Sequence, residues 1–133
     1  MTKSQIEQFK RKLEARREDA LRFLGRLGDE TRSLDADSPQ DIGDYSVATL
    51  SKESLIQQSS ERWRLVRAID AALQRIRRGT FGTCVGCGDE IHFRRLSALP
   101  WSEYCIACQE LREEENRGGV AVTQASWHRV HAE

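Results

Sequence analysis

The chain has 133 residues, of which 38% are hydrophobic and 32% are charged. This composition excludes a large globular core and indicates a small domain with an elongated part, which needs a metal, disulfides or a partner in order to fold. The 21 basic and 21 acidic residues cancel, which argues against general binding of DNA or RNA through phosphate contacts.

The sequence carries no sign of membrane insertion. Residues 1–12 contain no apolar run, and no other stretch approaches the roughly 20 apolar residues that a membrane span needs. We therefore expect a cytoplasmic protein without membrane contact. Because cytosolic thiols are kept reduced, cysteine pairs in such a protein are expected to bind a metal in preference to forming disulfides.

Residues 4–32 show the periodicity of a helix with one buried seam. Apolar residues recur at alternating spacings of three and four, with Arg16 filling one seam position. The seam consists of Ile6, Phe9, Leu13, Ala20, Phe23 and Leu27. No Pro interrupts the segment, so we predict a continuous helix.

Residues 34–44 then read LDADSPQDIGD, in which acidic residues accompany a Pro and a Gly. This composition predicts a loop, so we expect an acidic tip near residues 34–45.

From about residue 45 to residue 78 a second heptad seam follows, which predicts a second helix. It consists of Leu55, Leu65, Ile69, Ala72 and Ile76, with polar Gln58 and Arg62 between them. Arg77 and Arg78 suit a helix C-terminus, and Gly79 can close the helix.

Two seamed helices joined by a short loop should fold back on each other, because each seam alone would face water. We therefore predict a mainly α fold with a long antiparallel two-helix coiled coil over residues 1–79. An intramolecular pair of this kind implies a monomer. The alternative is one long helix that dimerises with another chain, which the composition of the loop opposes.

The four cysteines form two C-x-x-C pairs, Cys84 with Cys87 and Cys105 with Cys108, separated by seventeen residues. This spacing is typical of a tetrahedral Zn²⁺ site. A site with four thiolates has no open position for water, so one structural Zn²⁺ is expected and catalysis is not. Two disulfides or free thiols are the alternative. His92 lies between the pairs and is expected to be an ordinary surface residue.

We assign residues 80–117 to a small four-cysteine zinc finger followed by a short C-terminal helix, over about residues 103–117. Gly118 and Gly119 are expected to stop that helix. Residues 118–133 form a tail without clear periodicity, which is either disordered or docked through Trp127. His128 and His131 form an H-x-x-H pair in this tail, but a second metal site there would need more ligands nearby.

Residues 81–110 resemble the C4 zinc finger of the DksA/TraR family. The resemblance rests on F-G-x-C-x-x-C-G, then I-x-x-x-R-L-x-A-x-P, then C-x-x-C, so Arg95, Leu96, Ala98 and Pro100 match as well as the cysteines. Together with the helical arm it covers about residues 4–117. Members of this family insert a coiled coil through the secondary channel of bacterial RNA polymerase, where its acidic tip alters the stability of promoter complexes.

Family tips carry an Asp-x-x-Asp-x-Ala pattern, to which Asp41 and Asp44 correspond here, whereas Ser46 stands where Ala is usual. The resemblance thus implies a transcription regulator that binds RNA polymerase and does not recognise a DNA sequence directly. Without the resemblance, Asp44 could simply cap the second helix while Asp41 solvates the loop. Ser46 keeps a small side chain but adds a hydroxyl group.

Some family members bind the alarmone ppGpp at their interface with polymerase. The basic residues that they use align with Ala68, Leu99 and Gln109, all of which are uncharged. A site for a highly charged phosphate ligand is weakened by the loss of its cations. We therefore expect little or no response to ppGpp through that site.

Other functions are compatible with the sequence. A zinc-finger adaptor could bind a different protein through the coiled coil, and it would not need the tip carboxylates. A finger that binds nucleic acid could use Arg75, Arg77, Arg78, Arg94 and Arg95, although neutral net charge opposes it. No H-E-x-x-H, P-loop lysine or nucleophile elbow is present, so we expect no enzymatic activity. Oxidation of the thiolates could in principle release the metal.

Overall fold

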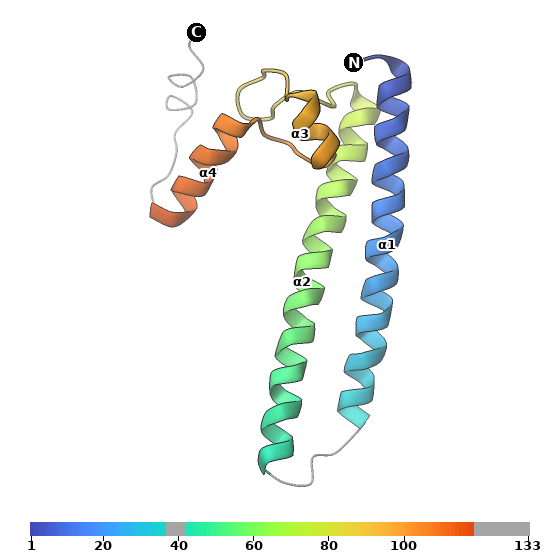
Figure 1. Cartoon of the computed structure of the whole chain (residues 1–133), viewed down its shortest axis with the longest axis vertical. Coiled ribbons are helices and arrows are strands. Elements are labelled where there is room, and N and C mark those ends of the chain that lie inside the picture. The colour runs from blue at the N-terminus through green and yellow to red at the C-terminus, as the bar shows by residue number, and fades with distance from the viewer. Residues whose placement is uncertain (37–41, 119–133) are drawn as a thin grey trace. The chain divides into compact units, whose positions relative to one another are not determined.

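The computed structural model describes residues 1–36 and 42–118, with the side chains of residues 34–36, 42–46, 48 and 118 left out. Helices dominate this part of the chain, and its only β pairing is an isolated antiparallel bridge between Thr83 and Glu90. The helices are α1 (Lys3–Ala36), α2 (Ile42–Arg78), α3 (Phe93–Ala98) and α4 (Ile106–Gly118) (Figure 1). The predicted mainly α fold is confirmed. None of these helices is long and apolar enough to cross a membrane.

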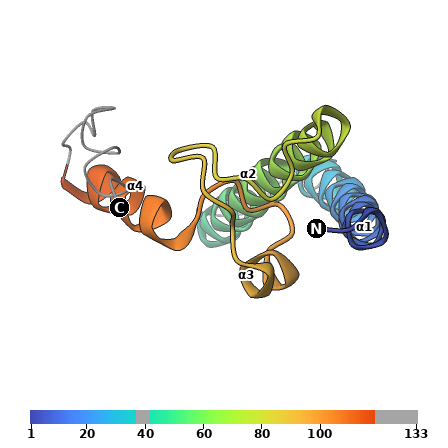
Figure 2. The ribbon, with the colours of Figure 1, turned by 90° about the horizontal axis from the view of Figure 1, so that it is seen from above.

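The described chain divides into two compact units. One is the helical hairpin Glu14–Asp70, in which α1 and α2 lie side by side and run antiparallel (Figure 1). The other, which we call the finger unit, combines Met1–Leu13 with the chain from Ala71 onward. In the finger unit, α4 extends away from α3 and from the end of α2 (Figure 2). Both long helices therefore contribute residues to both units.

The hairpin is held by the heptad seams that the sequence predicts. Ala20, Leu27, Leu55 and Ile69 are buried, and Val66 is buried beside them although it does not belong to the strict heptad. A core-facing helix usually buries such a flanking position, because its apolar stripe is wider than the narrow seam of a coiled coil. Removal of these side chains from water is the main source of stability for the hairpin.

Polar side chains complete the contact between the two helices. The guanidinium of Arg62 lies over the ring of Phe23, 4.2 Å from its centroid, so this polar seam position on α2 still packs against α1. Arg17 Nε donates to Asp70 Oδ1 at 2.7 Å, which joins the helices again. The side chains of that pair are 41% and 49% exposed, so solvent screens the pair and it adds only about 0–1 kcal/mol.

The long helices extend further toward the tip than the sequence predicts. α1 continues to Ala36 and α2 begins at Ile42, so part of the predicted loop 34–44 is helical. Asp44 is the third residue of α2 and thus lies within its first turn, where the helix dipole favours a carboxylate. Asp41 lies outside the described residues, as do the side chains of Asp44 and Ser46.

The C-terminus of α2 is closed by Gly79, as predicted. Gly79 has φ +77°, its N–H donates to the carbonyl of Ile76 at 3.2 Å, and the N–H of Thr80 donates to the carbonyl of Arg75 at 2.9 Å. This is the Schellman arrangement, which satisfies the last carbonyls of a helix and needs a residue that tolerates a left-handed backbone. The chain therefore leaves α2 in a defined direction toward the cysteines.

The finger unit has its own apolar core. The ring of Phe9, from the second turn of α1, packs against Phe81 and Phe93 with centroids 5.4 and 5.5 Å apart. Ile91 and Leu96 are buried in the same unit. The first turns of α1 thus supply part of the core on which the finger folds.

Candidate metal centre

The first cysteine pair lies in a tight turn that follows α2. The N–H of Cys84 donates to the carbonyl of Asp89 at 2.7 Å, and the N–H of Gly88 donates back to the carbonyl of Cys84 at 3.0 Å. Gly88 has φ +81°, a conformation that side chains disfavour, so glycine is needed directly after Cys87. These bonds place the thiols of Cys84 and Cys87 on one side of the turn.

The second pair lies where an irregular segment enters α4. Cys105 directly precedes this helix, and its carbonyl accepts the N–H of Gln109 at 2.9 Å. Cys108 follows three residues later in the first turn, and residues three apart share one face of a helix. The helical turn therefore presents the thiols of Cys105 and Cys108 together.

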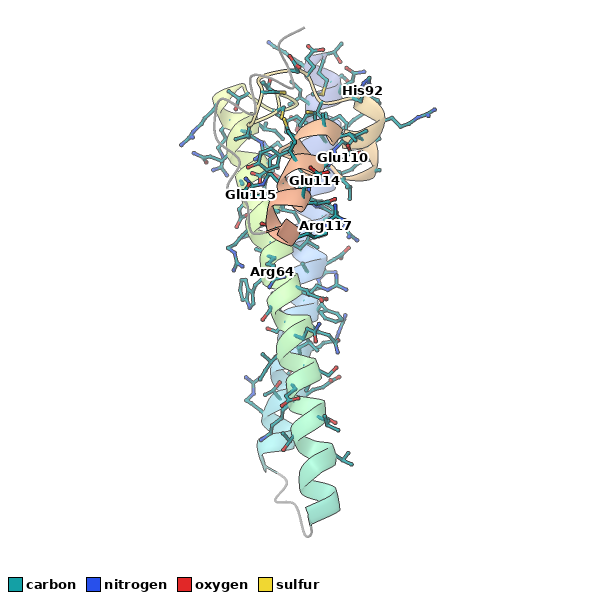
Figure 3. The ribbon with its side chains drawn as sticks, turned by 90° about the vertical axis from the view of Figure 1, so that its left-hand side faces the viewer. Arg64, His92, Glu110, Glu114, Glu115 and Arg117 are labelled. Carbon is teal, nitrogen blue, oxygen red and sulfur yellow. The ribbon has the colours of Figure 1, made fainter. Side chains whose placement is uncertain are left out.

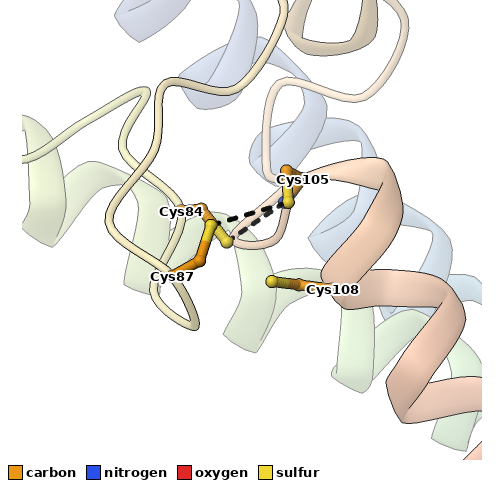
Figure 4. A group of neighbouring side chains, drawn as sticks. All are labelled: Cys84, Cys87, Cys105 and Cys108. Carbon is orange, nitrogen blue, oxygen red and sulfur yellow. Dashed lines mark hydrogen bonds between the residues drawn. The ribbon is translucent and has the colours of Figure 1, made fainter. Parts of the chain in front are cut away.

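All four sulfur atoms meet at one point. They lie within 4.8 Å of one another, and the Sγ atoms of Cys87 and Cys105 are 3.8 Å apart (Figure 4). Four thiolates at Zn–S distances near 2.3 Å and tetrahedral angles are separated by about 3.8 Å. None of the cysteines is in a disulfide. The four cysteines are therefore positioned to bind one metal ion, and the donor set suits Zn²⁺.

The histidine between the pairs does not join this group. Among the described residues, the cysteines form the one cluster with metal-ligand geometry, and His92 lies exposed on the surface (Figure 3). Its expected role as an ordinary surface residue agrees with this position. His128 and His131 lie outside the described residues.

Protons compete with a metal for these thiols. Burial raises the pKa of Cys87 to about 11 and also raises the pKa of Cys108. Burial acts in the same direction on Cys84, but hydrogen bonds from the backbone N–H groups of Cys105, Cys87 and Gly86 outweigh it and lower its pKa to about 7. The N–H of Cys105 lies 3.3 Å from the Cys84 sulfur. Metal binding must therefore release protons from the thiols that hold them most tightly.

Three of the five arginines considered for nucleic-acid binding donate to acceptors within the chain, whereas Arg78 and Arg94 are exposed. Arg75 and Arg95 donate to backbone carbonyls of the segment that leads into Cys105, and Arg77 donates to Gln74 at 3.0 Å. Sequence reasoning missed these contacts with the segment before Cys105, because nothing in the local pattern distinguishes a guanidinium that binds carbonyls from one that faces solvent. α4 carries projecting carboxylates, including Glu110 and Glu114 (Figure 3).

Comparison with known proteins agrees with this site. Residues 79–114 match the prokaryotic dksA/traR C4-type zinc finger. An uncharacterized protein of Aquifex aeolicus is 37% identical over 123 residues, covering 87% of this chain and 81% of that protein. The RNA polymerase-binding transcription factor DksA of Salmonella typhimurium is 31% identical over 121 residues, covering 89% of this chain and 80% of its own.

A solved structure supports the same assignment. Transcription factor DksA2 of Pseudomonas aeruginosa aligns with a TM-score of 0.77 and 27% identity, covering 88% of this chain and 89% of that one. Such relatives are transcription factors and not enzymes, in keeping with the expected lack of catalysis. The one metal implied by the family and by the cysteine geometry is a structural zinc ion. The chain belongs to the DksA/TraR family of C4-type zinc finger proteins.

Proposed function

We propose that this chain is a cytoplasmic transcription regulator that binds bacterial RNA polymerase through the secondary channel. In this proposal Asp41, Asp44 and Ser46 form the tip that changes the stability of promoter complexes, and the four cysteines hold the zinc ion that orders the finger. The observation that carries the proposal is similarity to RNA polymerase-binding DksA over four fifths of that protein's length.

The hairpin has chemistry that suits the proposed role. Between residues 29 and 61 the sequence holds eight acidic and two basic residues, whereas the whole chain is neutral. A narrow element with this charge can carry carboxylates toward cationic side chains or a metal-bound active centre.

We further propose a division of the chain into three parts. The arm spans residues 1–79, the finger with its short helix spans residues 80–117, and the tail spans residues 118–133. Because the two seams pair within one chain, we also propose that the protein acts as a monomer.

The tip is tested by replacing both of its carboxylates with amides. An Asp41→Asn/Asp44→Asn variant should bind core RNA polymerase as the wild type does, because the rest of the hairpin and the finger are unchanged. The wild type is expected to shorten promoter-complex lifetime, and the variant is expected to leave it close to that of polymerase alone. Binding is measured by a pull-down or fluorescence titration, and lifetime by decay of competitor-resistant complexes.

The matched control removes the same number of carboxylates on α2, away from the tip. A Glu53→Gln/Glu61→Gln variant, changed at two exposed residues, should keep the wild-type effect on lifetime. If the tip variant and this control behaved alike, the tip carboxylates would have no special role. If neither the wild type nor the variants bound polymerase, the family membership would describe the fold alone, and an adaptor that binds another protein through the hairpin would replace the proposal.

We also predict that ppGpp adds little to the effect of this protein. The family's basic positions correspond to Ala68, Leu99 and Gln109, and the side-chain amide of Gln109 donates to the carboxylate of Glu113 at 3.2 Å. A carboxylate beside that position disfavours a phosphate ligand further. Promoter-complex lifetime should therefore be unchanged by ppGpp when polymerase lacking its other alarmone sites is used. A marked enhancement by ppGpp under those conditions would contradict this prediction.

A further inference from the structure

The segment 101–104, which leads into Cys105, has no regular secondary structure, yet each of its backbone carbonyls accepts a hydrogen bond from another part of the chain. Only one of these bonds, from the N–H of Val85 to the carbonyl of Glu103 at 2.8 Å, comes from the backbone. The other three carbonyls accept from arginine side chains, because a chain outside helices and sheets must find its donors elsewhere.

Arg75 supplies two of these bonds from the C-terminal part of α2. One of its Nη atoms donates to the carbonyls of Trp101 and Ser102 at 3.4 and 3.3 Å, and the other lies 3.9 Å from the carboxylate of Glu103. Its side chain is only 13% exposed. Burial lowers the pKa of the guanidinium, but arginine remains charged at neutral pH. A charged donor that is this well buried binds carbonyls more strongly than a solvated one.

Arg95, from α3, acts on the peptide that joins Tyr104 to Cys105. Its Nε donates to the carbonyl of Tyr104 at 3.0 Å, and the N–H of the same peptide donates to the sulfur of Cys84 at 3.3 Å. Hydrogen bonds at the two ends of one peptide polarise each other. A cation at the oxygen end therefore strengthens the N–H bond to the thiolate at the nitrogen end.

We propose that Arg75 and Arg95 form a carbonyl clamp that positions the second cysteine pair for zinc. By binding the carbonyls of residues 101, 102 and 104, the clamp sets where Cys105 lies and where α4, which carries Cys108, begins. A Zn²⁺ ion bound by four thiolates carries net negative charge, so the two guanidinium groups also offset the charge of the loaded site. Arg75 and Arg95 are thus positioning residues that act on the metal through the backbone.

The test replaces each clamp arginine by methionine, which keeps a long apolar stem but removes the charge and the donors. Zinc affinity of the full chain is measured by competition with a chelator, and ligand geometry by the visible spectrum after Co²⁺ substitution. Arg75→Met and Arg95→Met are each expected to weaken zinc binding by about 10- to 100-fold, as for other groups that orient metal ligands. The cobalt bands should change in position or intensity.

Two arginines that lie close to the clamp residues in the sequence serve as matched controls. Arg77→Met and Arg94→Met change exposed residues close to each clamp residue and should leave both zinc affinity and the cobalt spectrum unchanged. Wild-type affinity and an unaltered cobalt spectrum in the two clamp variants would overturn the proposal. So would an equal loss of affinity in the controls, because this would reflect net charge and not position.

A conservative variant covers the case in which methionine prevents folding. Arg75→Lys keeps the charge but loses the planar fork that serves two carbonyls at once. It should retain the helical circular dichroism of the wild type and bind zinc more weakly than the wild type. If Arg75→Lys bound zinc with wild-type affinity, charge alone would account for the role of Arg75, and the clamp would be rejected.

Discussion

A Cys108→Ser variant is expected to lose stoichiometric zinc and, with it, most of the ordered structure of the finger unit. The Cys108 side chain is fully buried at the point where the four sulfur atoms meet. A serine hydroxyl cannot replace a buried thiolate as a zinc ligand, and the three remaining sulfurs leave the ion with an open position. Structural zinc sites contribute about 10–16 kcal/mol of apparent binding energy, which in small modules is also folding energy.

The zinc content of the purified chain and its thermal unfolding measure this effect. A strong chelator added to the wild type should reproduce the behaviour of the variant. Ile106→Ser is the matched control, because Ile106 lies in the same turn of α4 but is largely exposed; it should retain one zinc ion per chain. A Cys108→Ser protein that kept full zinc occupancy and wild-type stability would show that the four cysteines are not the metal ligands.

The same chelator competition should show that acid weakens zinc binding. In the metal-free site the pKa of Cys87 is raised to about 11 and that of Cys108 is raised as well, so both thiols are protonated at neutral pH. Zinc binding must displace those protons. Lowering the pH makes this displacement harder, whereas raising the pH makes it easier, so the apparent affinity should rise with pH. An affinity independent of pH would be inconsistent with thiolate ligation.

An Ile69→Ala substitution should have the largest effect on the hairpin. Ile69 is 0% exposed, and removing a buried side chain of this size costs about 2–5 kcal/mol through lost burial and the cavity left behind. Small domains are stable by only about 5–15 kcal/mol in total. Urea unfolding followed by helical circular dichroism should therefore show a clearly lower midpoint.

The control for this substitution is the same change on the same helix. Ile56 also belongs to α2 but is 61% exposed, so Ile56→Ala should change the free energy of unfolding by no more than about 0.5 kcal/mol. The two variants lose the same side-chain atoms and undergo the same change in helix propensity. The difference between their free energies of unfolding therefore measures the effect of burial. Similar unfolding midpoints for the two variants would mean that the seam does not form the core of the hairpin.

The amino-acid sequence by itself determined the elements whose cause is local. A 3.6-residue period is a property of consecutive residues, so the two heptad seams predicted both long helices, and Gly79 predicted where α2 ends. The spacing within each C-x-x-C pair likewise follows from the size of a turn, so the spacing alone identified Cys84, Cys87, Cys105 and Cys108 as candidate zinc ligands. The composition of residues 34–44 predicted the acidic loop, whereas the role of its carboxylates was inferred from the resemblance to the family and stays a prediction.

Only the tertiary structure decided features that depend on residues far apart in the chain. The six-residue helix α3 is too short to show periodicity, and Val66 is buried because of the width of the stripe that α1 covers. From the sequence, Arg75 is a cation near the end of a helix. In the structure its guanidinium donates to carbonyls 26 and 27 residues further along the chain. A guanidinium binds whichever acceptors the fold brings within reach, and only the folded chain determines which acceptors those are.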